Sequence, residues 1–330
     1  MDDTKPRNSN IVCVGGYSAL RYWSHMRAQQ DATDPFGTPM QRIHDTAYVS
    51  PRFLLTKQPH VPNHMPEGCQ KPIEVLVSNC SSRVKNSDAT ARIFSTPLPS
   101  HAFIRIDRQY AMSTPEFTFA QLAARITLVQ LIELGYELCG TYVSERYGPV
   151  TYRAKPATTV AKLRRLIEAA PRFHGRANAK RALKYIIGGS ASPRETQLAM
   201  LLSLPYLLGG YGFPQPLLNH RIDLPDSRKT GKRYLVCDQY WPKSKLDLEY
   251  DSDEFHAEKH KLADDARRRV ALEAIGVKSI NVSNDDLASG WAFNELANNL
   301  ARITGKRITR CDHKTIEQRR QLRLELGLRP

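Results

Sequence analysis

The sequence predicts an α/β protein in which a C-terminal α-β-β-β-α-β domain follows a mixed α+β N-terminal domain and a basic helical segment. The chain has 330 residues, of which 41% are hydrophobic and 25% charged, enough to bury a core in two domains. Its charges are unevenly distributed, and its C-terminal half alternates between helical and strand periodicity. We therefore divide the chain into an N-terminal domain (1–150), a basic helical connector (151–190), an α/β domain (191–305) and a basic tail (306–330).

The N-terminal domain has several weak local signals. We expect a helix over 18–28, a proline-rich irregular stretch over 34–72, and strands over 73–77, 92–95 and 102–106. Ser113-Thr-Pro-Glu116 has the pattern of a capping box with proline in the first turn. It predicts a long apolar helix that ends near Gly135.

The C-terminal half gives clearer periodicity. Apolar residues at helical spacing predict two short basic helices over 160–170 and 177–187. The expected elements after them are a helix (193–204), three strands (217–222, 232–239 and 245–251), a helix (254–275), a strand (277–282) and a helix (285–303).

The composition favours a partner that is a polyanion. Lys and Arg number 48 against 33 Asp and Glu, which gives a net charge of +15 and makes DNA the leading expected partner. Six cysteines without a CxxC pair indicate reduced thiols and a cytoplasmic location. The longest apolar run, 198–208, contains Pro205 and is too short to cross a bilayer, so we expect no membrane partner.

The connector concentrates positive charge. Residues 151–186 contain ten basic side chains against Glu168 alone. They form either a solvated cationic face or a surface that binds phosphates. The candidate nucleic-acid contacts are Arg164, Arg165, Lys180, Arg181 and Lys184.

The acidic residues gather further along the chain. The segment 245–251 alternates strictly, which places Asp247, Glu249 and Asp251 on one face of a strand. Asp238, on the preceding strand of the predicted meander, can lie across from them. Carboxylates crowded in this way repel unless they are solvated, protonated or bridged by a divalent cation. The segment is therefore either a solvated acidic edge or a site for Mg2+ or Mn2+.

Several of these residues together resemble the PD-(D/E)XK nuclease fold, within it the very-short-patch-repair-like endonuclease domain family. The resemblance covers 192–283 and depends on Ser192-Pro-Arg-Glu195, Cys237-Asp238, Leu248-Glu-Tyr-Asp251 followed by His256, Asp265-x-x-Arg268, Leu272, Gly276 and the strand 279–282. Ser252 replaces the glycine of the family pattern, and Asp251 stands where other nucleases of the fold have lysine. The resemblance implies a restriction-endonuclease-like fold.

Residues upstream resemble a second family. Gly175-Arg, Arg181-Ala-Leu and the helix after Ser113-Thr-Pro-Glu116 are similar to regions of AbiEi-type antitoxins of type IV toxin-antitoxin systems. The resemblance implies a role in such a system or in defence. A cognate toxin or a second copy of the chain stays open as a partner.

The candidate site residues have distinct expected roles. Asp238 and Glu249 would hold one or two Mg2+ ions, and Asp251 would be a further ligand or would orient a water. Glu195 either completes the site or only caps its helix. His256 is either a general base or phosphate contact, or an ordinary surface histidine. Arg268 is a phosphate or carboxylate partner, or part of a basic helix face.

Two functions follow. The first is a metal-dependent DNA endonuclease or nickase. The second is a non-catalytic, antitoxin-like DNA-binding regulator in which the nuclease-like domain is a scaffold.

Overall fold

We analysed a computed structural model of the chain. The structure describes residues 11–29, 61–62, 64–83, 85–144, 149–170, 172–225, 233–251, 259–308 and 312–329. Most of the expected irregular stretch 34–72 and all of His256 lie outside the described residues. The chain is of the mixed α/β class and forms two compact units, Met1–Ile186 and Ile187–Pro330.

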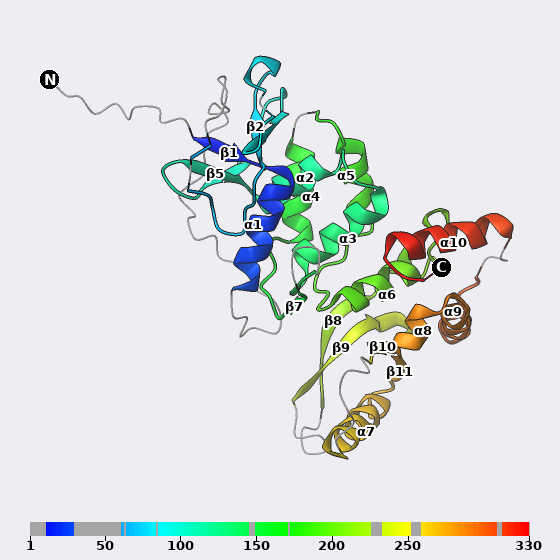
Figure 1. The fold of residues 1–330 in the computed structure, drawn as a ribbon. Coiled ribbons are helices and arrows are strands. Elements are labelled where there is room, and N and C mark those ends of the chain that lie inside the picture. Colours follow the sequence, from blue (N-terminus) through cyan, green and yellow to red (C-terminus); the bar gives the residue numbers. More distant parts are fainter. Residues whose placement is uncertain are drawn as a thin grey trace. The chain divides into compact units, whose positions relative to one another are not determined.

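The first unit contains a mixed five-stranded sheet. Its strands are β1 (Val12–Val14), β2 (Ile73–Val77), β3 (Ala89–Ile93), β4 (Phe103–Arg105) and β5 (Tyr110–Ser113), in the order β3-β2-β1-β5-β4. β1 is parallel to β5 and antiparallel to β2, while β2 and β3 are parallel. β4 is antiparallel to β5. Helix α1 (Gly16–Ala28) follows β1 directly (Figure 1). Its residues Tyr22 and Trp23 are buried in the core together with residues of this sheet.

Two helices replace the single helix expected up to Gly135. They are α2 (Pro115–Leu122) and α3 (Leu128–Cys139). The side chain of Thr127 accepts from the backbone nitrogen of Gln130, and the Gln130 side chain accepts from the nitrogen of Thr127. This capping box begins a new helix and divides the apolar segment. The cap of α2 is Thr114 rather than Ser113.

The expected connector is part of the first unit. Helices α4 (Val160–Ala169) and α5 (Arg176–Ala182) pack with α2 and α3 (Figure 1). The short strands β6 (Tyr142–Val143) and β7 (Thr151–Tyr152) pair with each other. Leu163, Ile167 and Ala179 are buried, so the apolar faces of both helices add to the core instead of linking two domains. Gly175 has a φ of +89°, and a Cβ there would lie 2.5 Å from the backbone nitrogen of Ala124.

The second unit contains a four-stranded sheet and several helices. The elements are α6 (Pro193–Ser203), β8 (Leu217–Asp223), β9 (Tyr234–Trp241), β10 (Leu246–Tyr250), α7 (Lys259–Ala274) and β11 (Lys278–Val282). The strand order is β11-β10-β9-β8, in which β8, β9 and β10 are antiparallel neighbours and β11 is parallel to β10 (Figure 1). Helix α7 is therefore the crossover between two parallel strands.

Three further helices complete this unit: α8 (Asn284–Ala288), α9 (Gly290–Thr304) and α10 (His313–Glu325). The helix expected over 285–303 is interrupted because Ser289 ends α8 and caps α9. The expected basic tail contains α10, which buries Leu322 and Arg323. Arg323 donates to the backbone oxygens of Leu287 and Ala288 at 3.0 and 2.7 Å. In the described part of the chain, no helix has the length and apolar character needed to cross a membrane.

Candidate metal and nucleic-acid sites

Four carboxylates from three elements come together in the second unit. We call this set, Glu195 of α6, Asp238 of β9, and Asp247 and Glu249 of β10, the acidic cluster. Arg268 of α7 and Cys237 of β9 lie against it. The cluster therefore depends on the packing of both α6 and α7 on the sheet.

Glu195 is held at the start of α6. The Ser192 hydroxyl accepts from its backbone nitrogen at 3.1 Å, which is the N-cap expected from the sequence. Its carboxylate accepts from the backbone nitrogen of Ala191 at 3.0 Å and from the side-chain amide of Asn219 at 2.7 Å. Burial, and then the charge of Asp238, raise the pKa of Glu195 to about 7. Glu195 therefore both belongs to the capped first turn of α6 and lies close to Asp238.

Asp238 lies where β9 changes its packing partner. Cys237 packs in the apolar cluster with Leu272 of α7, whereas Gln239 donates to the backbone oxygen of Glu195 on α6 at 3.1 Å. Opposite this point Asn219 of β8 has a φ of +46°. The side chain of Asp238 accepts from the backbone nitrogen of Tyr250 at 3.0 Å. Burial, and then the charge of Glu249, raise the pKa of Asp238 to about 7.

Asp247 is fully buried and only partly hydrogen-bonded. Its Oδ2 accepts from the Ser279 hydroxyl at 3.2 Å and lies 3.9 Å from Nη2 of Arg268. Its Oδ1 accepts no hydrogen bond from any residue that the structure describes. Burial raises the pKa of this carboxyl. A carboxyl oxygen that is buried without a hydrogen-bond partner is costly in either protonation state, so this atom points to an additional ligand.

Glu249 is the carboxylate that pairs with Arg268. The guanidinium donates to its Oε1 and also to the backbone oxygen of Val236 at 2.5 Å. The backbone nitrogen of Asp238 donates to the same Oε1 at 3.4 Å. Burial, and then the charge of Asp247, raise the pKa of Glu249 to about 8.

The cluster contains donor atoms that suit a divalent cation. Sγ of Cys237 and one carboxylate oxygen each of Asp247 and Glu249 lie within 4.8 Å of one another. Burial raises the pKa of Cys237 above its usual range, so the group remains a thiol and the carboxylate oxygens are the available anionic ligands. Oxygen ligands suit Mg2+ and Mn2+. Within the described residues, one guanidinium, that of Arg268, contacts this group of four carboxylates, at Asp247 and Glu249.

The predicted site residues have different positions in the structure. It brings together Glu195, Asp238, Glu249 and Arg268. Asp251 is exposed just beyond β10, at an open pocket lined also by Glu249, Tyr250, Arg268, Arg269, Ser279 and Asn281. Nothing is described for His256.

Two members of the site were missing from the sequence-based candidate set. Asp247 lies on the same predicted acidic face as Glu249, so the alternation of residues 245–251 could have identified it as a candidate ligand. Cys237 gave no such signal, because a cysteine in an apolar strand is usually a core residue. Arg268 was expected to contact a phosphate or a carboxylate or to lie on a basic helix face, and in the structure it contacts carboxylates.

The candidate nucleic-acid residues lie in the first unit. Arg164 and Arg165 are on α4, Lys180 and Arg181 are on α5, and Lys184 follows α5; all five are exposed. Their charges therefore face solvent, while neighbouring apolar residues anchor the helices.

Comparison with known proteins gave no relative: no protein-family model, curated protein or solved structure matches this chain.

Proposed function

We propose that this protein is a metal-dependent endonuclease or nickase that hydrolyses phosphodiester bonds in DNA. The observation that supports it best is the buried, bare Oδ1 of Asp247 within a group of four carboxylates that contacts a single guanidinium. An acidic core residue that served only the fold would be expected to have a full set of partners.

The proposal assigns roles to the residues of the cluster. Asp247 and Glu249 would hold Mg2+ or Mn2+ together with Asp238, whose carboxylate lies beside Glu249. A bound divalent cation polarises a phosphoryl oxygen and lowers the pKa of a bound water. Glu195 would complete the site from α6, where its charge interacts with that of Asp238. Asp251, exposed at the adjacent pocket, is placed to orient a water or a phosphate group.

Arg268 has two consequences for this proposal. Its guanidinium keeps the pair Asp247 and Glu249 close together when no cation is bound. A metal cation that binds these carboxylates weakens their ion pairs with Arg268, and the N–H groups of Arg268 then become available to a phosphate. We expect Arg268 to be a positioning residue for the two carboxylates.

Cleavage of supercoiled plasmid tests the proposal. Full-length protein is incubated with plasmid in Mg2+, in Mn2+ and in EDTA, and nicked and linear products are quantified. We expect metal-dependent cleavage that Asp238→Asn and Glu249→Gln each reduce at least about 100-fold, because each removes an anionic ligand. Glu273→Gln is the matched control, since Glu273 is exposed on α7. Equal cleavage by wild type and both site variants would refute the site, and absence of cleavage in either metal would refute the function.

A second candidate is a DNA-binding, antitoxin-like regulator without catalysis. The ion pair between Arg268 and Glu249 favours it, because an internal cation can neutralise part of the cluster without metal. This hypothesis predicts DNA binding that needs no divalent cation and persists in EDTA, with no product in the plasmid assay. The two candidates therefore separate in one experiment.

A further inference from the structure

The first unit contains a pocket that the proposed nuclease site does not use. It has a volume of about 310 Å³, which is within the range of small-molecule sites. It is lined by residues at the start of α1, on β2, on and after β3, on and after α2, and in the segment between α4 and α5, among them Arg92, Ile93, Phe94, Arg125 and Phe173.

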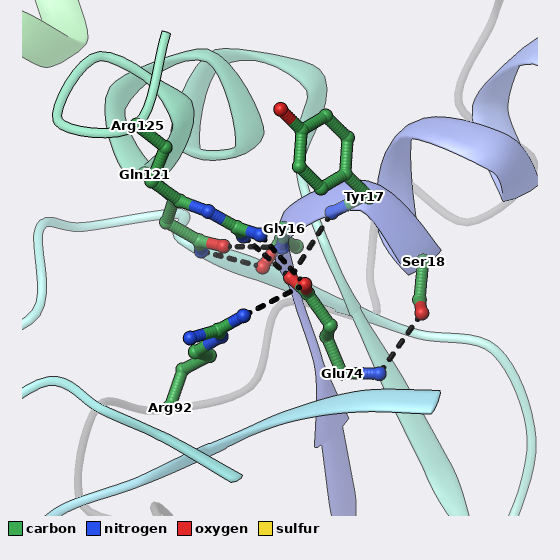
Figure 2. A network of polar contacts seen from close by, with 8 residues as sticks. Gly16, Tyr17, Ser18, Glu74, Arg92, Gln121 and Arg125 are labelled. Carbon is green, nitrogen blue, oxygen red and sulfur yellow. Dashed lines mark hydrogen bonds and ion pairs between the residues drawn. The ribbon is translucent and has the colours of Figure 1, made fainter. Parts of the chain in front are cut away.

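Two of the lining residues are arginines, and both contact the carboxylate of Glu74 on β2. Arg125 donates to both carboxylate oxygens of Glu74 at 2.6 and 2.7 Å, and Arg92 approaches Oε1 of Glu74 at 3.4 Å (Figure 2). Burial favours a raised pKa for Glu74, but the hydrogen bonds and charge of Arg125 outweigh it and the pKa is lowered. Glu74 is therefore ionised, and two guanidinium groups against one carboxylate leave one net positive charge.

The backbone N–H groups at the start of α1 are already hydrogen-bonded and are not available to bind an anion in the pocket. The backbone nitrogen of Gly16 donates to the Gln121 side chain at 2.6 Å, and that of Tyr17 donates to Glu74 at 3.2 Å (Figure 2). Side chains of other elements thus already cap this helix. An anion in the pocket would have to be bound by the arginines.

Arg92 is the arginine with the most available donor capacity. Its side chain is 49% exposed, and within the described residues its one polar contact is the long one to Glu74. A guanidinium has five N–H donors in a planar fork, which matches the oxygens of a phosphate. Arg125 is better fixed, since its guanidinium stacks at 4.4 Å over the ring of Tyr17. One arginine is therefore rigid and the other is free to turn toward a ligand.

The opposite side of the pocket is apolar and partly aromatic. Ile93 is 38% exposed at the end of the edge strand β3. Phe94 and Phe173 are only partly buried, and Phe94 is held by an edge-on contact with Phe117 at 5.1 Å. A flat ring placed against these side chains would cover apolar surface that now meets water.

We propose that this pocket binds a mononucleotide-sized phosphate ester that carries an aromatic ring. Arg92 and Arg125 bind the phosphate, and the ring packs against Ile93, Phe94 and Phe173. The contacts proposed for the ring are apolar and aromatic, so the proposal predicts binding of several bases. It is independent of the proposed nuclease activity.

Titration of the full chain in EDTA tests the proposal, because chelation removes any contribution of metal at the acidic cluster. The probes are the four ribonucleoside 5′-monophosphates, the corresponding nucleosides and inorganic phosphate, followed by calorimetry and by the shift in melting temperature. We expect the monophosphates to bind at least about tenfold more tightly than nucleosides or inorganic phosphate, because only they use both sides of the pocket.

Two charge-matched variants locate the binding. Arg92→Gln should weaken nucleotide binding about tenfold or more, whereas Arg108→Gln, at an exposed turn residue before β5, should leave it unchanged. Phe173→Ser should reduce the preference for nucleotides over inorganic phosphate. Arg92 and Arg108 are both exposed, so without ligand the two arginine variants should have the melting temperature of wild type. Equal losses in the two arginine variants, equal affinity for nucleotides and inorganic phosphate, or no binding of any monophosphate would each overturn the proposal.

Discussion

Arg268 of α7 and Glu249 of β10 form an ion pair inside the acidic cluster, and the same guanidinium binds the backbone oxygen of Val236 in β9. One side chain therefore connects the crossover helix to two strands of the sheet. Among the described residues it is the cation that contacts the cluster, so the fold and the electrostatics of the site depend on it together.

Replacing this arginine should destabilise the metal-free protein. In Arg268→Met, Asp247 and Glu249 lose their partner, and breaking a buried pair by removing one member typically costs about 3 kcal/mol. We expect the free energy of unfolding in urea to fall by about that amount in EDTA and to recover partly in Mg2+. Arg269→Met is the control, because Arg269 is the exposed neighbour on the same helix. A loss of equal size in both variants would mean that the ion pair contributes nothing specific.

The stability of the metal-free protein should fall as pH rises from about 5 to 8. Burial raises the pKa of Glu195 from 4.5 to about 7, so the folded protein binds more protons than the unfolded chain between these values. The slope of stability against pH is then negative, and the cost at pH 8 is about 3 kcal/mol for this group. Glu195→Gln removes the titration while keeping an acceptor for Ala191.

Urea denaturation at pH 5 and pH 8 in EDTA measures this effect. The Glu195→Gln variant should match wild type at pH 5 and exceed it at pH 8. Glu273→Gln, which removes an exposed carboxylate of α7, should follow the wild-type profile. Parallel profiles for wild type and Glu195→Gln would contradict the burial argument.

The basic helices should contribute directly to DNA affinity. Each neutralised phosphate releases counterions, so log K falls with log salt by about 0.9 per contact. Replacing Arg164, Arg165, Lys180 and Arg181 by Gln should weaken binding to unrelated duplexes equally and flatten the slope by up to about four units. Helix propensity changes little, so folding should be retained. Identical slopes for wild type and the quadruple variant would remove this surface from the interface.

Arg27 should be essential for the stability of the first unit. It is 1% exposed and donates to the backbone oxygens of Lys155, Gly140 and Tyr142 at 2.7 to 2.9 Å. Arg27→Met leaves these carbonyls without their donor, at a cost of about 3 kcal/mol or more. Thermal unfolding should show a clear drop in melting temperature, with Arg165→Met, at an exposed position of α4, as the control. A melting temperature within a degree of wild type would refute this role.

Two strands could be predicted from local sequence. The strand expected at 245–251 is β10 (Leu246–Tyr250), where polar and apolar residues alternate strictly. The strand expected at 73–77 is β2 (Ile73–Val77), a short run rich in apolar and β-branched residues. β1 is three residues long and β5 four, too short for a period, and both are defined by pairing with distant segments.

The site could be predicted only where its residues were neighbours in sequence. The alternation around Glu249 placed three carboxylates on one face, but pairing with Arg268 depends on how α7 crosses back over the sheet. Oδ1 of Asp247 lacks a hydrogen-bond partner because none of the described elements around it places a donor there. Such a property belongs to the assembled core, so no local pattern encodes it.

The anchoring of α4 and α5 has a consequence for how their charges act. Leu163, Ile167 and Ala179 fix these helices in the core, and the left-handed Gly175 fits against the backbone at Ala124. The cationic array is therefore ordered before any polyanion arrives. A flexible basic tail loses conformational entropy when it binds, whereas here the backbone that carries Arg164, Arg165, Lys180 and Arg181 is already fixed by folding, and only side-chain motion remains to be restricted.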